Sequence, residues 1–362
     1  MSNQIFQTLK ELPIPLDQVQ CVLYKHELLI CGGYEQRACY SYHKIKNEYK
    51  FICEYPSDVQ LKGHCVVKLV DNSNNNNKDS NQITVLSFGG LYKHTLVMKY
   101  VSVWSDKSKN SNNYNQWIPF TDNHNNQIDI GGNYGDYVGV RAVVSGSNNH
   151  LLFITYQSKN ISVFDLNIFQ FIKRDILPTD FTNYHCFVSN SENGQGQEMI
   201  KTNQGKIKQN YKMLLFCKKT GLSIEYDEDS NSFQFRQLTV CHNIEQFFRY
   251  AYVCINGVIL FFGGWNCKIG SDRIISKSVH KYSIRENKWM TFKNTLLSPL
   301  QYCTAILSEE DNYIHIIGGL DKRTVSTNEI KCIIQYWTRT FKIKLGWIDD
   351  FNQIIMKYNR MK

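Results

Sequence analysis

The stretch Val258-Ile259-Leu260-Phe261-Phe262-Gly263-Gly264 decides the fold, because an apolar run that ends in two glycines returns along the chain. It returns as Leu28-Leu29-Ile30-Cys31-Gly32-Gly33, as Thr84-Val85-Leu86-Ser87-Phe88-Gly89-Gly90 and as Ile314-His315-Ile316-Ile317-Gly318-Gly319. Two further apolar runs lack the glycines, Leu151-Leu152-Phe153-Ile154-Thr155 and Met213-Leu214-Leu215-Phe216-Cys217. Such self-similarity is the signature of a repeat architecture. We therefore interpret the chain as six repeats of one strand-rich unit.

Each unit is expected to hold four strands. A leading strand precedes each apolar run, and the leading strands begin near residues 20, 64, 141, 185, 250 and 302. Asn256-Gly257 joins the fifth pair of strands and is suited to a two-residue type I′ turn. A third and a fourth strand follow, with aromatic residues seven positions apart: Tyr42 and Tyr49, Tyr226 and Phe233, Tyr282 and Trp289.

The pattern resembles the kelch repeat, whose period of about 50 residues is close to the spacing found here. The resemblance covers residues from about 6 to about 336 and implies an all-β propeller of four-stranded blades, six in number, with seven as the alternative. We expect the paired glycines to permit positive φ where blades meet, and the aromatic residues to fill the space between blades. These structural glycines are Gly32, Gly33, Gly89, Gly90, Gly263, Gly264, Gly318 and Gly319.

Repeats three and four depart from this pattern. Thr155-Tyr156 and Lys218-Lys219 stand where the other repeats have glycine, so these two blades are expected to be the least regular. Three polar, Asn-rich stretches, 71–82, 105–116 and 191–209, are expected to be solvated loops that project from a blade.

The two ends of the chain suggest different roles. Residues 1–336 are assigned to the propeller, and residues 6–12 resemble the ends of later repeats, so we expect them to supply the outer strand of the last blade. Residues 337–362 carry apolar side chains at three- and four-residue spacing, which predicts an amphipathic helical tail. That tail would pack on the propeller, bridge to another chain or lie on a membrane surface.

Composition limits the class of protein. Of the 362 residues 42% are hydrophobic, which is enough for a core and excludes a wholly disordered chain. The formal net charge is +9, but the basic residues are scattered, so no clear nucleic-acid arm is present. No secretory leader and no apolar run of membrane-spanning length is visible. We therefore expect a cytoplasmic protein.

The 12 cysteines do not suggest disulfides or a zinc site. No CxxC spacing occurs, and a Cys inside an apolar run behaves as a small buried hydrophobe. The cysteines in such runs are Cys21, Cys31, Cys65, Cys186, Cys217, Cys254 and Cys303. Catalytic and nucleotide-binding motifs are also missing, so we expect no cofactor, no metal and no enzyme activity.

One set of residues is the candidate binding site. The residues that open or precede the leading strands would converge around one mouth of the propeller channel: Gln20, His64, Arg141, His185, Arg249, Tyr250, Gln301 and Tyr302. In the kelch proteins that this chain resembles, this position often holds Arg, and such residues commonly contact acidic peptides. Basic side chains there would favour an acidic or phosphorylated segment. Alternatively, these residues only satisfy loop carbonyls and channel water.

The leading hypothesis is a non-enzymatic module or scaffold that binds a partner protein through the mouth and the propeller loops. A second hypothesis is a carbohydrate-binding or enzymatic propeller, because kelch-like folds include copper-radical oxidases and sugar epimerases, and Tyr250 and Tyr302 would stack on a sugar. A third is association with nucleic acid or an anionic membrane through the positive charge.

Overall fold

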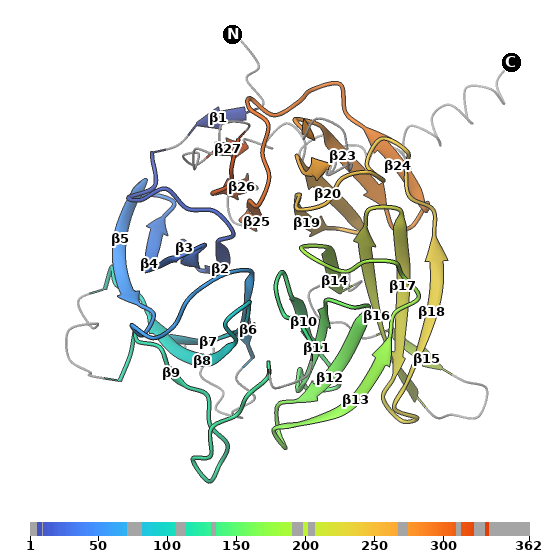
Figure 1. Cartoon of the computed structure of the whole chain (residues 1–362), viewed down its shortest axis with the longest axis horizontal. Helices are drawn as coiled ribbons and strands as arrows, with labels where there is room; N and C mark the ends of the chain where they lie inside the picture. The colour runs from blue at the N-terminus through green and yellow to red at the C-terminus, as the bar shows by residue number, and fades with distance from the viewer. Residues whose placement is uncertain are drawn as a thin grey trace, which may run out of the picture.

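The fold is a ring of β-sheets, shown in the computed structural model of Figure 1. The structure describes residues 6–8, 10–70, 82–105, 113–131, 135–189, 198–201, 207–266, 274–308, 313–321 and 330–332. All regular secondary structure within these ranges is β-strand. The predicted helical tail, 337–362, lies outside the described residues.

Six sheets form the ring, and each is a blade built from an inner strand to an outer one. Blade 1 contains β2 (Gln20–Tyr24), β3 (Glu27–Gly33), β4 (Gln36–His43) and β5 (Glu48–Glu54). Blade 2 contains β6 (His64–Leu69), β7 (Gln82–Gly89), β8 (His94–Val101) and β9 (Ile118–Pro119). Blade 3 contains β10 (Arg141–Ser145), β11 (Leu151–Tyr156), β12 (Asn160–Asp165) and β13 (Gln170–Ile176).

Five of the six blades have four strands, and blade 4 has five. Blade 4 contains β14 (Cys186–Ser189), β16 (Ile207–Cys217), β17 (Thr220–Asp227) and β18 (Ser232–Leu238), and β15 (Glu198–Lys201) pairs with β16. Blade 5 contains β19 (Ala251–Ile255), β20 (Val258–Phe262), β23 (Val279–Ser283) and β24 (Lys288–Thr291). Blade 6 contains β25 (Thr304–Ser308), β26 (Tyr313–Ile317), β27 (Ile330–Cys332) and, from the N-terminal end, β1 (Phe6–Thr8).

The ring closes by pairing strands from opposite ends of the chain. β1 runs antiparallel to β27, with Phe6 opposite Cys332 and Thr8 opposite Ile330. The N-terminal segment thus forms the outer strand of the last blade, the position that the sequence predicted for it. The inner strand β2 also contacts β25, so blade 1 and blade 6 are neighbours.

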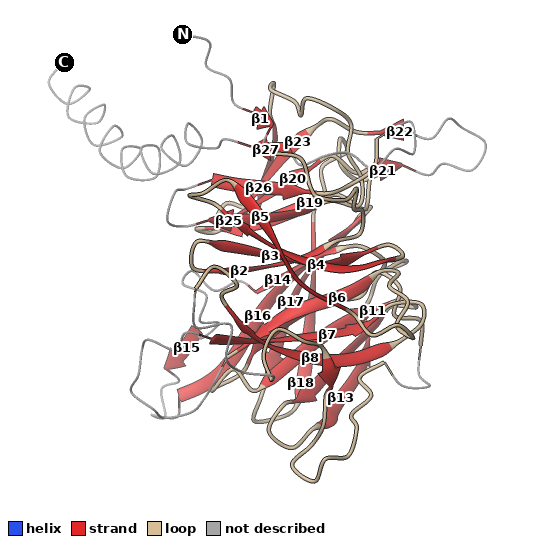
Figure 2. Ribbon diagram, turned by 90° about the vertical axis from the view of Figure 1, so that its left-hand side faces the viewer, coloured by secondary structure: helices blue, strands red, loops and turns tan. Residues whose placement is uncertain are grey.

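The ring has two distinct faces. We call the end where the inner strands begin the mouth face; the short ribbon of β21 (Trp265–Asn266) and β22 (Ile274–Ile275) projects from this side. The opposite end is the far face, from which β15 projects in Figure 2. The stretch 191–209 was expected to be a solvated loop throughout, and this was wrong in part, because β15 pairs with β16 through Lys201 and Ile207.

The paired glycines lie where one blade meets the loop that leads into the next. Gly32, Gly89, Gly263 and Gly318, the first glycine of each pair, all have positive φ. At Gly318, φ is +67°, and a Cβ would lie 2.7 Å from the backbone oxygen of Leu16 in the loop before β2. Blade 6 and blade 1 therefore meet at a distance that admits no side chain at this point.

Blades 3 and 4 were expected to be the least regular, and this holds only in part. Blade 3 has a register shift between Val163 and Phe164 and blade 4 has a fifth strand, but blade 1 has two register shifts. The central hairpins of blades 3 and 4 are unbroken. β11 pairs with β12 over six residue pairs without a break, and β16 pairs with β17 over eight. In contrast, the glycine-containing pair β3–β4 has a register shift between Cys31 and Gly33. Ser158, Lys159 and Lys218 take positive φ themselves, so these tight turns form without glycine and leave the ladder unbroken.

Three blades share one turn on the far face, which explains the spacing of seven. Tyr42 stands directly opposite Tyr49, Tyr226 opposite Phe233, and Tyr282 opposite Trp289. In each turn the tyrosine hydroxyl donates to the side-chain oxygen of the Asn five residues on, at 2.8 to 2.9 Å. Those residues, Asn47, Asn231 and Asn287, all have positive φ. The two-residue turn at Asn256-Gly257 is likewise confirmed as type I′ by positive φ at both residues.

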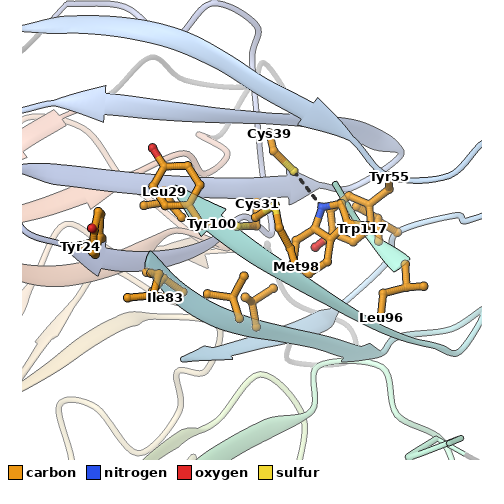
Figure 3. Packing of buried hydrophobic residues seen from close by; sticks show 14 residues of the cluster. Tyr24, Leu29, Cys31, Cys39, Tyr55, Ile83, Leu96, Met98, Tyr100 and Trp117 are labelled. Carbon is orange, nitrogen blue, oxygen red and sulfur yellow. Dashed lines mark hydrogen bonds between the residues drawn. The ribbon is translucent and has the colours of Figure 1, made fainter. Parts of the chain in front are cut away.

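Apolar side chains fill the spaces between blades. Figure 3 shows the cluster between blades 1 and 2, where the Trp117 Nε1 donates to the Cys39 sulfur at 3.4 Å and the indole stacks on Tyr55. Cys31 and Cys39 are buried there as free thiols. Of the seven cysteines expected in the core, five are buried (Cys31, Cys65, Cys186, Cys217 and Cys303), whereas Cys21 and Cys254 are only partly buried.

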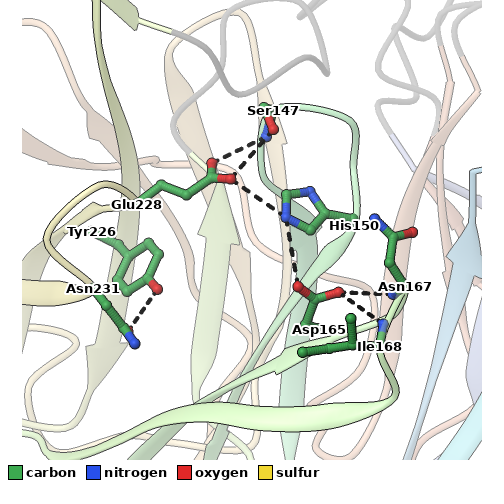
Figure 4. Close-up of polar contacts among 8 residues, drawn as sticks. All are labelled: Ser147, His150, Asp165, Asn167, Ile168, Tyr226, Glu228 and Asn231. Carbon is green, nitrogen blue, oxygen red and sulfur yellow. Dashed lines mark hydrogen bonds and ion pairs between the residues drawn. The ribbon is translucent and has the colours of Figure 1, made fainter.

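A polar contact joins blades 3 and 4 on the far face (Figure 4). His150 Nε2 lies 3.4 Å from Glu228 Oε1 and 3.9 Å from Asp165 Oδ2. The backbone N–H and the hydroxyl of Ser147 both donate to the Glu228 carboxylate. The acidic turn of blade 4 is therefore held against the first hairpin of blade 3.

Candidate binding site at the channel mouth

A belt of backbone hydrogen bonds surrounds the channel on the mouth face. The belt residues all have positive φ and lie one or two positions before an inner strand: Gln18, Gly63, Gly139, Tyr184, Arg249 and Tyr302. Several donate their N–H to the carbonyl of the belt residue in the preceding blade: Gly139 to Gly63, Tyr184 to Gly139, Tyr302 to Arg249, and Gln18 to Tyr302, at 2.8 to 3.0 Å. The left-handed backbone turns each of these N–H groups towards the neighbouring blade.

The side chain of Tyr184 crosses this mouth. It belongs to blade 4, and its hydroxyl donates to Gln18 Oε1 of blade 1 at 2.6 Å. Gly63 and Gly139 leave the room for it, because a Cβ at either position would lie 2.6 Å from an atom of the Tyr184 side chain. The mouth is therefore occupied by protein at this level, and a ligand would lie on the outside of the Tyr184 ring.

Cationic side chains lie against aromatic rings around Tyr184. The Arg249 guanidinium carbon is 4.1 Å from the centre of the Trp265 ring and 4.4 Å from that of Tyr302. The Tyr302 ring meets the Tyr184 ring edge-on, with centroids 4.9 Å apart. Arg141 stands 5.7 Å from the centre of the Tyr184 ring.

Lys218 adds a third cation from blade 4. Its ammonium group lies 4.5 Å from the centre of the Phe181 ring and 4.6 Å from that of Phe248. We call Arg141, Lys218 and Arg249 the mouth cations. Within the described ranges neither Arg141 nor Lys218 has a carboxylate within ion-pair distance.

One buried carboxyl lies beside the belt. Asp17 is 7% exposed, and burial raises its pKa from the usual value of 3.8 to about 6, against a hydrogen bond with Gln18 that lowers it. Burial also raises the pKa of the Tyr184 hydroxyl, although Arg141 and Arg249 act in the opposite direction. The Tyr184 hydroxyl therefore stays protonated at neutral pH and remains a donor to Gln18.

Replacing Asp17 by Asn is expected to stabilise the protein at neutral pH. Because the folded-state pKa is above the usual value, the folded protein holds this proton between about pH 4 and pH 6 and the unfolded chain does not. The free energy of unfolding of the wild type therefore falls as pH rises through that window, by roughly 2 to 3 kcal/mol. Urea denaturation of Asp17→Asn across this range should lack that fall.

The exposed Glu35 is the matched control, because it also lies near Asp17 but is in solvent. Glu35→Gln should keep the pH dependence of the wild type. A fall of equal size in Asp17→Asn would contradict the assignment of the pH dependence to Asp17.

The structure brings part of the predicted site together. Arg141, Arg249 and Tyr302 contact Tyr184 or its partners at the mouth, as described above. Gln301 pairs with Leu320 through its backbone beside Tyr302. Gln20 lies just inside the belt, where its side-chain amide donates to the backbone oxygen of Val19.

The other three predicted residues do not line the mouth, and their inclusion was wrong. His64, His185 and Tyr250 are buried. His64 Nε2 is 3.1 Å from the Cys31 oxygen, His185 Nε2 is 2.6 Å from Thr155 Oγ1, and the Tyr250 hydroxyl donates to the Phe216 oxygen. Burial lowers the pKa of His64 to about 4 and that of His185 well below its usual value, so neither adds charge at neutral pH.

Strand alternation explains this error. The residue directly after each belt residue turns into the space between blades and is buried, while the belt residue itself stays on the mouth. These buried residues are Val19, His64, Val140, His185, Tyr250 and Cys303. Gln18 and Tyr184 were missed for this reason, although Tyr184 precedes His185 just as Arg249 precedes Tyr250. The second hypothesis offered Tyr250 and Tyr302 as stacking residues for a sugar, and Tyr250 is excluded from that role because its ring is buried.

Comparison with known proteins supports the fold and no further identity. No protein-family model matches the chain, and no curated protein matches it. Among solved structures, the one titled "Structure of YjhT" has 13% identity and a TM-score of 0.60, with 90% of this chain and 96% of that chain covered. A fungal alcohol oxidase of the AA5 family, in complex with copper, has 12% identity and a TM-score of 0.51, with 88% of this chain and 61% of that chain covered.

The chain shares the β-propeller fold of these two structures, with blades of four strands or more around one axis. Among the described residues, no three His, Cys, Asp or Glu side chains are grouped in a way that would hold a metal ion. Nor does any described segment form a long apolar helix of the kind that crosses a membrane.

Proposed function

We propose that this propeller is a non-enzymatic, cytoplasmic module that binds an acidic segment of a partner protein at its channel mouth. The observation that carries the proposal is the set of mouth cations, Arg141, Lys218 and Arg249, held on aromatic rings from blades 4 to 6. A cation that lies on a ring and lacks a carboxylate neighbour favours an anionic ligand. Arg141 and Lys218 meet this condition within the described residues.

The rigidity of the mouth supports the same role. The belt hydrogen bonds and the contact between Tyr184 and Gln18 fix the backbone beneath the cations. A ligand that binds a preorganised surface loses little to the ordering of the protein. The blocked channel favours a segment that lies across the mouth over one that threads through it.

A peptide array tests the proposal. The wild-type chain is expected to retain peptides rich in Asp and Glu over matched peptides rich in Lys or in neutral residues. The double variant Arg141→Ala with Lys218→Ala should weaken binding to the retained peptides by about tenfold or more, since each charge-assisted contact contributes roughly 1 kcal/mol.

Lys173→Ala is the matched control. Lys173 is a lysine on the outer strand β13 that lies 4.0 Å from Asp175. It should bind the acidic peptides like the wild type. An array without enrichment of acidic peptides, or an unchanged affinity in the double variant, would remove the basis of the proposal.

A further inference from the structure

Ile45 lies at the tip of the far-face turn between β4 and β5, and it is aliphatic where the same turn in two other blades has a charged residue. In the shared turn described above, the third residue after the tyrosine is Ile45 in blade 1, Asp229 in blade 4 and Arg285 in blade 5. All three are exposed, and Ile45 is 71% exposed. Since the same turn forms with a charged residue at this place, the fold does not require an aliphatic side chain there.

Trp104, which follows β8 of blade 2, lies under Lys46 and Lys50 of blade 1. The ammonium groups of Lys50 and Lys46 stand 4.4 Å and 5.2 Å from the centre of the Trp104 ring. Both lysines are exposed, and the described residues include no carboxylate in an ion pair with either of them. Lys50 also donates to the backbone oxygen of Val103 at 3.4 Å.

Trp104 is fixed from below by a buried chain of hydrogen bonds. Its Nε1 donates to Ser41 Oγ at 2.9 Å, and Ser41 Oγ donates to Glu27 Oε2 at 2.7 Å. The Tyr100 hydroxyl donates to the same carboxylate oxygen. The indole is therefore a rigid platform that holds two like charges next to each other at the surface.

Lysines outnumber carboxylates around this turn, where Lys46 and Lys50 are exposed beside one exposed carboxylate, Glu48. Burial and the charge of Lys46 lower the pKa of His43, whose ring meets Trp104 edge-on with centroids 5.1 Å apart. Lys25, in the adjacent turn between β2 and β3, is exposed on the same face. The acidic turn of blade 4, with Asp229, lies in another sector of the ring.

We propose that the far face of blade 1 is a docking site for anionic phospholipid membranes. Lys46 and Lys50 bind lipid phosphates, and Ile45 inserts between the headgroups. A single aliphatic side chain flanked by lysines suits the interface between headgroups and acyl chains. This site is separate from the mouth, which lies at the opposite end of the inner strands.

Nucleic acid fits this surface less well. A base would need a free aromatic face to stack on, and the Trp104 ring is covered by the two lysines, with its N–H already bonded. The exposed Ile45 would have no favourable contact with a phosphate backbone.

Vesicle co-sedimentation of the full chain tests the site. We expect binding to phosphatidylcholine vesicles that contain phosphatidylserine, no binding to pure phosphatidylcholine, and release at high salt. Lys46→Glu with Lys50→Glu should reduce the partition coefficient by about tenfold or more. Ile45→Ser should reduce it several-fold at unchanged thermal stability.

Two control variants locate the effect. Lys288→Glu changes an exposed lysine at the start of β24, directly after the equivalent turn of blade 5, and should bind vesicles like the wild type. The double variant at Arg141 and Lys218 should also bind vesicles normally, so the membrane site and the mouth can fail independently. Equal binding to the two kinds of vesicle, or wild-type binding by the folded Lys46/Lys50 variant, would overturn the proposal. So would a single-stranded RNA that displaces the protein from vesicles and loses affinity in the same variant, because it would assign the site to nucleic acid.

Discussion

Replacement of Gly318 by alanine is expected to lower the free energy of unfolding by roughly 2 to 5 kcal/mol. Two costs add at this position. A φ of +67° is left-handed and costs a residue with a Cβ about 1 to 2 kcal/mol. The new methyl would also lie 2.7 Å from the Leu16 oxygen and 2.9 Å from Val19 Cγ1, and relief of such a clash costs about 1 to 3 kcal/mol. Urea denaturation followed by circular dichroism measures the sum.

Gly257 separates the two costs. Its φ is +71°, but a Cβ there would meet nothing within 4 Å. Gly257→Ala should therefore lose only the backbone term, about 1 to 2 kcal/mol. If the two alanine variants lose equal stability, the close contact between blade 6 and blade 1 is not what requires glycine at 318.

Replacement of Glu27 by alanine is expected to cost about 3 kcal/mol or more. Glu27 is 5% exposed, and its Oε2 accepts hydrogen bonds from Ser41 and Tyr100. Removal of the carboxylate leaves two buried hydroxyl donors without their acceptor, and each such loss costs roughly 1 to 3 kcal/mol. Denaturant titration gives the size of the loss.

Companion variants show whether the loss comes from the hydrogen bonds. Glu27→Gln keeps an acceptor and should lose less than the alanine variant. In a double-mutant cycle, Tyr100→Phe should cost clearly less in the Glu27→Ala background than in the wild type. Glu48→Ala removes an exposed carboxylate of the same blade and should stay within about 0.5 kcal/mol of the wild type. Additive losses at 27 and 100 would argue against a coupled network.

The propeller was predictable from the sequence because its signals are local and repeated. An apolar run that ends in two glycines indicated the second strand of a blade, which ends where the next blade begins. A tyrosine seven residues before another aromatic residue indicated the turn between the third and fourth strands. The N-terminal segment was placed by its likeness to later blade exits, and β1 pairs with β27 as that likeness implied. The central hairpins of blades 3 and 4 are more regular than expected, because lysine and serine can adopt positive φ when a tight turn imposes it.

The sequence by itself determined that this chain repeats a four-stranded unit and buries most cysteines of its apolar runs, since periodic apolar and glycine positions decide both. Only the tertiary structure decided which residues reach a surface. Tyr184 meets Gln18 across 166 positions of sequence, and Trp104 meets Ser41 across 63. The assignment of His64 and His185 to the mouth failed by one residue, because a shift of one position in a strand turns a side chain from the mouth to the core. Such contacts depend on how six blades are arranged around one axis, and no single stretch of the chain records that arrangement.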